Sequence, residues 1–83
     1  MSANNTKEIG LAIIGSGTIG RIRAMIAKDH PGVGWIGLCD INEEVGQKLT
    51  EDSGADYFTG SYEELLRRPE VNAAIIATDE NFH

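Results

Sequence analysis

The chain has 83 residues, which is near the lower limit for an independently folding domain. Its net charge of −6 argues against nucleic acid or an anionic membrane as a partner, since both are polyanions. A single cysteine excludes a disulfide framework and favours a cytoplasmic location, and no apolar run is long enough to span a membrane.

The first third of the chain predicts a strand followed by a helix. Residues 1–8 are polar and are expected to form a flexible N-terminus. The apolar run Ile9–Ile14 predicts a strand buried on both faces. A helix is expected from Thr18 to about Asp29, ended by Pro31. Helical spacing predicts that its inward face consists of Ile19, Ile22 and Ile26, with Met25 beside them.

The middle third repeats this order. Trp35–Cys39 is the expected second strand. Asn42 is suited to cap a second helix, which Gly54 should end. The apolar positions Val45 and Leu49 predict the inward face of that helix.

The last third adds two strands around a short helix. Tyr57–Thr59 is expected to be an edge strand. Ser61 and Glu64 have the spacing of a capping box, and Pro69 ends the helix that they begin. The continuously apolar run Ala73–Ala77 predicts a last strand that is buried centrally.

This alternation predicts an α/β fold with one parallel sheet and helices on both faces. Placing the first strand between the second and the fourth gives the strand order 3-2-1-4. Residues 9–83 would then form the N-terminal part of a doubly wound dinucleotide-binding domain of the Rossmann type. No second domain is recognisable in these residues.

A glycine-rich motif directly follows the first strand. The expected cofactor-binding loop consists of Gly15, Ser16, Gly17, Thr18, Ile19 and Gly20. In such a motif the first glycine permits a tight turn, the second lets backbone N–H groups approach a pyrophosphate, and the third lets the helix pack closely on the sheet. The alternative is a glycine-rich turn with a purely structural role.

An acidic residue at the end of the second strand favours NAD over NADP. Asp40 lies twenty positions after Gly20, where a carboxylate would accept a hydrogen bond from a ribose hydroxyl. A 2′-phosphate about 4 Å away would be repelled by up to about 4 kcal/mol per unit charge at an effective dielectric near 20. Ile41 is placed to lie against an adenine. The alternative for Asp40 is a surface carboxylate that caps the next turn.

Other candidate residues are less specific. Thr78, at the end of the last strand, is expected either to hydrogen-bond the cofactor or to stabilise a turn. Arg21 could reach a phosphate or be a solvated side chain. Cys39 is expected to be a packed thiol rather than a redox centre. No spacing of cysteine and histidine indicates a metal site, and no catalytic residue is assigned.

Several stretches resemble the glucose–fructose oxidoreductase/inositol dehydrogenase family. The resemblance covers Ile9 to His83 and is strongest in the last segment, where a histidine follows a threonine by five positions. Asp79 and Glu80 depart from the proline and asparagine that are usual there. The matching stretches are Leu11–Gly20, His30–Val33, Leu38–Asp40, Ser61–Leu66 and Val71–Thr78.

This resemblance implies an NAD(P)-dependent oxidoreductase that moves hydride between nicotinamide and a sugar, a polyol or a related alcohol. It implies that Thr78 faces the cofactor and that His83 lies near the nicotinamide. The catalytic Glu-Lys-Pro motif and the second domain of the family are absent, so the chain alone is expected to be inactive. We expect a fragment of a longer dehydrogenase that self-associates when isolated. The alternative is a non-catalytic module that binds or senses a nucleotide.

Overall fold

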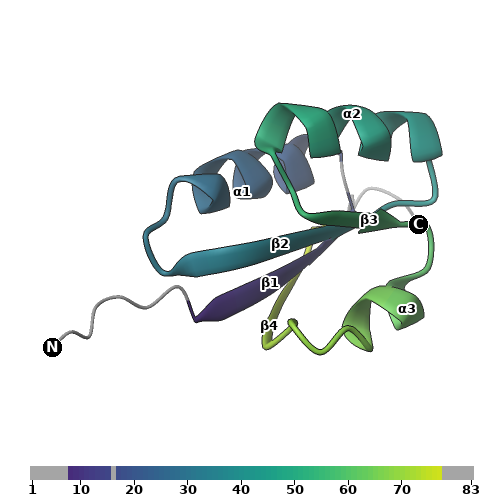
Figure 1. The fold of residues 1–83 in the computed structure, drawn as a ribbon. Helices are drawn as coiled ribbons and strands as arrows, with labels where there is room; N and C mark the ends of the chain where they lie inside the picture. The colour runs from purple at the N-terminus through teal and green to yellow at the C-terminus, as the bar shows by residue number, and fades with distance from the viewer. Residues whose placement is uncertain (1–7, 16, 78–83) are drawn as a thin grey trace, which may run out of the picture.

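The computed structural model describes residues 8–15 and 17–77, with only the backbone described at residues 18 and 19. Strands and helices alternate along the chain (Figure 1). In order, they are β1 (Ile9–Ile14), α1 (Thr18–Lys28), β2 (Val33–Cys39), α2 (Glu43–Ser53), β3 (Tyr57–Thr59), α3 (Tyr62–Leu66) and β4 (Ala73–Ile76).

The four strands form one parallel sheet in the order β3-β2-β1-β4, which confirms the predicted topology. Helices α1 and α2 cover one face, and α3 lies on the other (Figure 1). Strand β2 begins two residues earlier than predicted because Val33 already pairs with Ile9 of β1. Among the described residues, no helix is long and apolar enough to cross a membrane.

Alternation along β1 separates two hydrophobic cores. Leu11 and Ile13 face α1 and α2, where they pack with Leu49 of α2. Ala12 faces the opposite side and packs with Leu65 of α3, which is fully buried. Strand β1 lies between these two cores, so most of its residues have no solvent-facing side. This explains why β1 is apolar along most of its length.

Two of the three isoleucines predicted to face the sheet from α1 do not do so, and the side chain of the third, Ile19, lies outside the described residues. Ile22 and Ile26 are 51% and 60% exposed, whereas Ala24 and Ala27 are buried. The small side chains let the helix lie close to the sheet, as does Gly20, where a Cβ atom would be only 1.9 Å from the carbonyl oxygen of Gly15. The close packing of α1 on the sheet therefore sets the orientation of the helix, and the orientation predicted from apolar periodicity is wrong at Ile22 and Ile26.

The caps of α2 are as predicted, whereas its inward face is only partly so. The Asn42 side chain accepts from the Val45 amide, and Gly54 ends the helix with a φ of 71°. Leu49 is 1% exposed, but Val45 is 42% exposed, so only Leu49 faces the core as predicted.

The predicted capping box of α3 forms only in half. The Ser61 hydroxyl accepts from the Glu64 amide at 3.2 Å. The Glu64 carboxylate accepts instead from the hydroxyls of Tyr57 and Thr59. The Ser61 amide donates to Thr59 Oγ1 at 3.1 Å, so a threonine replaces the glutamate as its partner.

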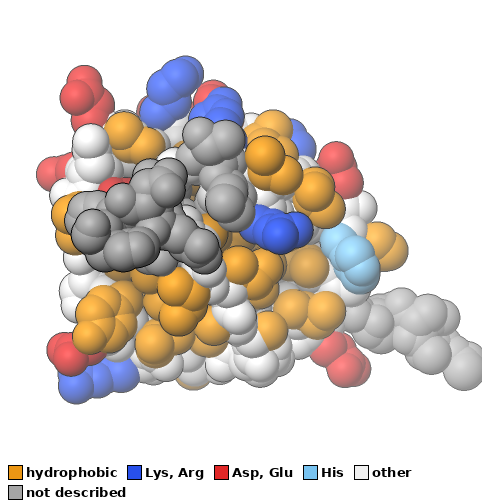
Figure 2. Space-filling model, turned by 180° about the vertical axis from the view of Figure 1, so that it is seen from behind, with side chains coloured by type: hydrophobic (Ala, Val, Ile, Leu, Met, Phe, Trp, Pro, Cys, Tyr) orange, Lys and Arg blue, Asp and Glu red, His pale blue; other side chains and the backbone are white. Residues whose placement is uncertain are grey.

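Strand β4 has the position that the predicted strand order gives it, so the separate prediction of a central strand, drawn from its apolar run, is wrong. It lies at one edge of the sheet described here and ends at Ile76, although Ala77 is buried. Ala73 and Ile75 pack towards the α1 side of the sheet, while Ile76 is 71% exposed. Hydrophobic side chains gather on the face of the molecule seen in Figure 2.

Candidate dinucleotide site

The carboxyl ends of three strands bring the predicted site residues together. The Gly15 amide donates to the Cys39 carbonyl at 2.7 Å, and the Ala77 amide donates to the Ile14 carbonyl at 2.8 Å. The glycine loop therefore lies between the end of β2 and the end of β4, where open α/β sheets bind their ligands. Ser16, Thr78 and His83 lie outside the described residues.

The three glycines of the loop have different surroundings. Gly15 has a φ of 103°, a backbone conformation that side chains disfavour. Gly20 packs against the Gly15 carbonyl, as described above. A Cβ atom at Gly17 would meet no described atom within 4 Å, so nothing in the described part of the protein requires a glycine there. As far as the described atoms show, the space in front of Gly17 is open.

The amino end of α1 is suited to an anion. Its N-cap is Gly17, which has no side-chain cap, and its first turn has no acidic residue. In contrast, α2 and α3 are each capped by a side chain and carry two glutamates in the first turn. Among the described residues, neither a capping side chain nor a first-turn acid offsets the positive end of the α1 dipole, whereas α2 and α3 have both.

Asp40 lies just beyond β2, at the same edge of the sheet. Its Oδ1 atom accepts from the Asn42 amide at 2.7 Å, and its own amide donates to the Thr59 carbonyl at 3.3 Å. The carboxylate thus has the turn-capping contact that was the structural alternative. Next to it, Ile41 is 94% exposed, which leaves this apolar side chain accessible to a flat ring.

Arg21 is directed to α2 in this structure. Its guanidinium group forms an ion pair with Asp52, which Lys48 also contacts at 3.6 Å. The hydrogen bond from Arg21 is the main cause of a lowered pKa at Asp52. The guanidinium therefore links the two helices, and a phosphate contact would require this pair to open.

Cys39 is a packed thiol, as predicted. It is 4% exposed and lies in the core beneath α3 with Ala12 and Leu65. Burial, with a smaller effect from the charge of Asp40, raises the pKa of the thiol. Among the described residues, no group of three or more His, Cys, Asp or Glu side chains is placed to hold a metal ion.

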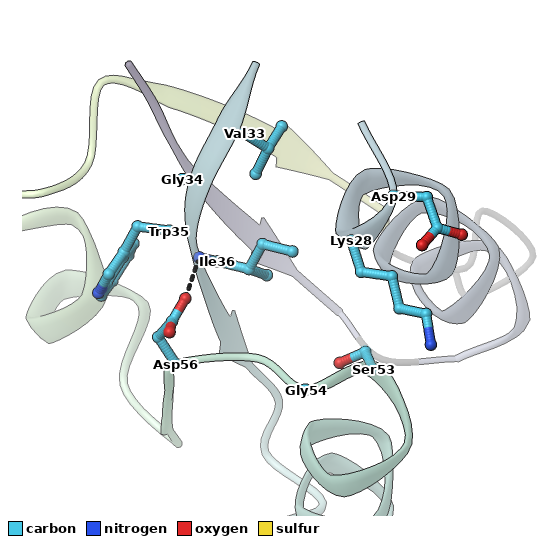
Figure 3. A pocket seen from close by; sticks show the side chains of 9 residues that line it. All are labelled: Lys28, Asp29, Val33, Gly34, Trp35, Ile36, Ser53, Gly54 and Asp56. Carbon is cyan, nitrogen blue, oxygen red and sulfur yellow. Dashed lines mark hydrogen bonds between the residues drawn. The ribbon is translucent and has the colours of Figure 1, made fainter. Parts of the chain in front are cut away.

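A hollow of about 230 Å³ lies elsewhere, at the amino end of β2 (Figure 3). Val33 and Ile36 line it together with Ser53 and Asp56. The Asp56 carboxylate accepts from the Ile36 amide at 2.9 Å, so it fixes the loop that enters β3. Nothing in the sequence motifs indicated this hollow, and it shares no residue with the glycine loop.

The geometry above defines a domain of the NAD-binding Rossmann class. The chain belongs to the oxidoreductase family with an NAD-binding Rossmann fold, whose model matches residues 9–83. This confirms the predicted glucose–fructose oxidoreductase/inositol dehydrogenase family and the predicted cofactor, NAD.

A curated relative comes from Phocaeicola vulgatus. It is named glycosyl hydrolase family 109 protein 3 and is 33% identical over 91 residues. The alignment covers 100% of this chain and 17% of the relative.

Solved structures of dehydrogenases share the fold. GenD2 from gentamicin A biosynthesis, solved in complex with NAD, superimposes with a TM-score of 0.81 at 27% identity over 94% of this chain and 22% of its own. A probable dehydrogenase from Thermotoga maritima gives a TM-score of 0.77 at 25% identity over 90% of this chain and 22% of its own. The myo-inositol dehydrogenase of Lactobacillus casei, at 19% identity, shares the fold with a TM-score of 0.79 over 90% of this chain and 23% of its own. The chain spans about a fifth of the length of these proteins.

Proposed function

We propose that this chain is the part of an NAD site that holds the adenosine and pyrophosphate groups. Asp40 would accept from the adenosine ribose, and Ile41 would lie against the adenine. Thr78 would face the cofactor and His83 would lie near the nicotinamide, as the family resemblance implies. The pyrophosphate loop would consist of Gly15, Ser16, Gly17, Thr18, Ile19 and Gly20.

The open space at Gly17 is the observation that carries this proposal. A glycine required by the protein itself, such as Gly20, has neighbours that a side chain would strike. Gly17 has none among the described atoms, yet it caps the one described helix whose dipole has no acidic or side-chain partner. An anion bound by backbone amides explains both features. The residues present therefore fit a dinucleotide.

For a longer protein that contains this chain, we propose hydride transfer between NAD and a sugar, a polyol or a related alcohol. NAD supplies the hydride acceptor, while this chain binds and orients it. The sequence lacks the Glu-Lys-Pro motif that the family resemblance links to catalysis, so we expect the 83 residues alone to be inactive.

Glycoside hydrolysis is the second candidate for the longer protein, because the Phocaeicola relative is named a glycosyl hydrolase. Hydrolysis is redox-neutral, so it would produce no net NADH. The longer protein should be supplied with alcohols and with glycosides while NADH absorbance and sugar release are followed. NADH formation supports the dehydrogenase, and sugar release without it supports the hydrolase. Neither product, with retained NAD binding, would support the alternative of a nucleotide-sensing module.

Titration calorimetry with NAD and NADP tests the binding site in the chain itself. We expect NAD to bind more tightly than NADP, and we expect Gly17→Val to abolish NAD binding because its side chain fills the space meant for phosphate. Circular dichroism should show that this variant keeps the fold, since no described atom lies in the way. Unchanged NAD affinity in Gly17→Val would refute the proposed site.

A further inference from the structure

Two side-chain-to-backbone hydrogen bonds follow one another at the corner between β2 and α2. The Asn42 amide donates to Asp40 Oδ1 at 2.7 Å, and the Val45 amide donates to Asn42 Oδ1 at 3.1 Å. The Asn42 carbonyl also accepts the first helical bond, from Gly46 at 3.0 Å. Asn42 therefore contacts the Asp40 carboxylate with its main chain and the first turn of α2 with its side chain.

We propose that Asn42 is a positioning residue, which fixes the Asp40 carboxylate for the ribose and thereby contributes to the choice of NAD over NADP. This inference rests on the proposed role of Asp40. A free aspartate side chain would populate several rotamers, and binding would have to select one of them. The bond from the Asn42 amide holds one carboxylate oxygen in place before the cofactor arrives.

The hydrogen bond from Asn42 can position the Asp40 carboxylate because α2, which Asn42 caps, is itself packed against the core. Leu49 is 1% exposed in the core, and Gly46 lies so close to Phe58 that an added Cβ atom would be 2.0 Å from the ring. On its other side, the Asp40 amide donates to the Thr59 carbonyl of β3. Residues 40–42 are thus bonded to two packed elements, β3 and α2. The position of Asp40 therefore depends on the cap that joins Asn42 to α2.

A purely structural cap would act differently. Loss of a helix cap costs about 0.5–2 kcal/mol of stability wherever the helix lies. A positioning role additionally changes the ratio of NAD to NADP affinity, which a general loss of stability leaves unchanged. Ser61→Ala is the matched control, because Ser61 caps a different helix, α3, by accepting from the Glu64 amide.

The experiment measures NAD and NADP affinities in the full chain for four variants. Asn42→Ala should weaken NAD binding by about three- to tenfold, in line with the loss of a cap, and should lower the NAD:NADP ratio. Asn42→Ser keeps a capping oxygen and should restore both values. Ser61→Ala should lower the melting temperature but keep the ratio. Asp40→Asn keeps an acceptor but loses the charge, and should lower the ratio most.

Hydrogen exchange of the residue 42 amide provides a readout that needs no ligand. We expect faster exchange in Asn42→Ala and Asp40→Ala, and wild-type exchange in Asp40→Asn and Ser61→Ala. If Asp40→Asn lowers the NAD:NADP ratio and Asn42→Ala leaves it unchanged, the positioning role is overturned and the proposed site stands. If Asp40→Asn leaves the ratio unchanged, the ribose role of Asp40 fails and this inference fails with it.

Discussion

Gly20 illustrates how a single residue of the binding motif can act on the fold rather than on the ligand. A Cβ atom there would lie 1.9 Å from the Gly15 carbonyl oxygen, which belongs to the backbone and cannot rotate away. We expect Gly20→Ala to destabilise the protein by about 1–3 kcal/mol, as is typical of overpacking. Gly17→Ala, with open space around it, should cost less than about 1 kcal/mol.

Urea unfolding of the two glycine variants measures this difference. Equal stability of Gly20→Ala and wild type would show that α1 can move away from the loop, and that the third glycine is not a packing requirement.

At the scale of the element, α1 and α2 differ in what their apolar residues contribute. Leu49 of α2 is 1% exposed, whereas Ile26 of α1 is 60% exposed. Leu49→Ala should therefore cost about 2–5 kcal/mol through lost burial and a cavity, and Ile26→Ala less than about 1 kcal/mol. Chemical denaturation of both variants decides the matter. A large loss in Ile26→Ala would mean that α1 packs as its sequence periodicity predicted.

Helix α3 should show a pH-dependent contribution to stability. Its Glu64 accepts from the Tyr57 hydroxyl, which is the main cause of a lowered pKa at Glu64 and of a raised pKa at Tyr57. The ionised carboxylate is favoured by folding, so its contribution is present above about pH 4.5 and is lost as pH falls through the lowered pKa. The neutral phenol is likewise favoured, so its contribution is lost as pH rises through a pKa above 10.0.

The difference in unfolding free energy between wild type and Tyr57→Phe, measured across pH, tests this linkage. We expect it to be largest at neutral pH and to shrink at both extremes. Trp35, whose ring stacks on Tyr57 with centroids 6.0 Å apart, provides the fluorescence signal. Tyr62→Phe is the control, because Tyr62 is 54% exposed and lies on α3, the helix that carries Glu64. A difference independent of pH would contradict the linkage.

At the scale of the whole molecule, β4 forms one edge of the described sheet. The strand Ala-Ala-Ile-Ile carries neither charge nor proline, and Ile76 is 71% exposed. Natural edge strands often carry charged residues or proline, which prevent an open edge from pairing with other chains. We therefore expect the isolated 83-residue chain to self-associate through β4.

Light scattering after size-exclusion chromatography, over a range of concentrations, tests this expectation. Ile76→Lys should shift the chain towards the monomer. Ile41→Lys is the matched control, since Ile41 is 94% exposed but lies at the corner after β2 rather than on the sheet edge. A wild-type chain that stays monomeric at every concentration would contradict self-association through this strand.

Local chemistry explains why much of the fold was predictable. Helix α2 begins after Asn42 and ends before Gly54, as expected, because a capping side chain and a left-handed glycine act within one turn of the helix. The orientation of α1 was not predictable in the same way. Its isoleucines have the correct period for a buried face, but among the described positions of α1 the small residues Gly20, Ala24 and Ala27 are the ones packed inward.

The sequence by itself determined the order of the elements, the family and the glycine loop that follows β1, since each depends on residue type and spacing along the chain. Only the tertiary structure decided that Arg21 pairs with Asp52 and that Glu64 pairs with Tyr57. Those outcomes depend on which elements meet in space. Contacts between residues far apart in the chain produce no periodic pattern in the sequence, so they could not be predicted from it.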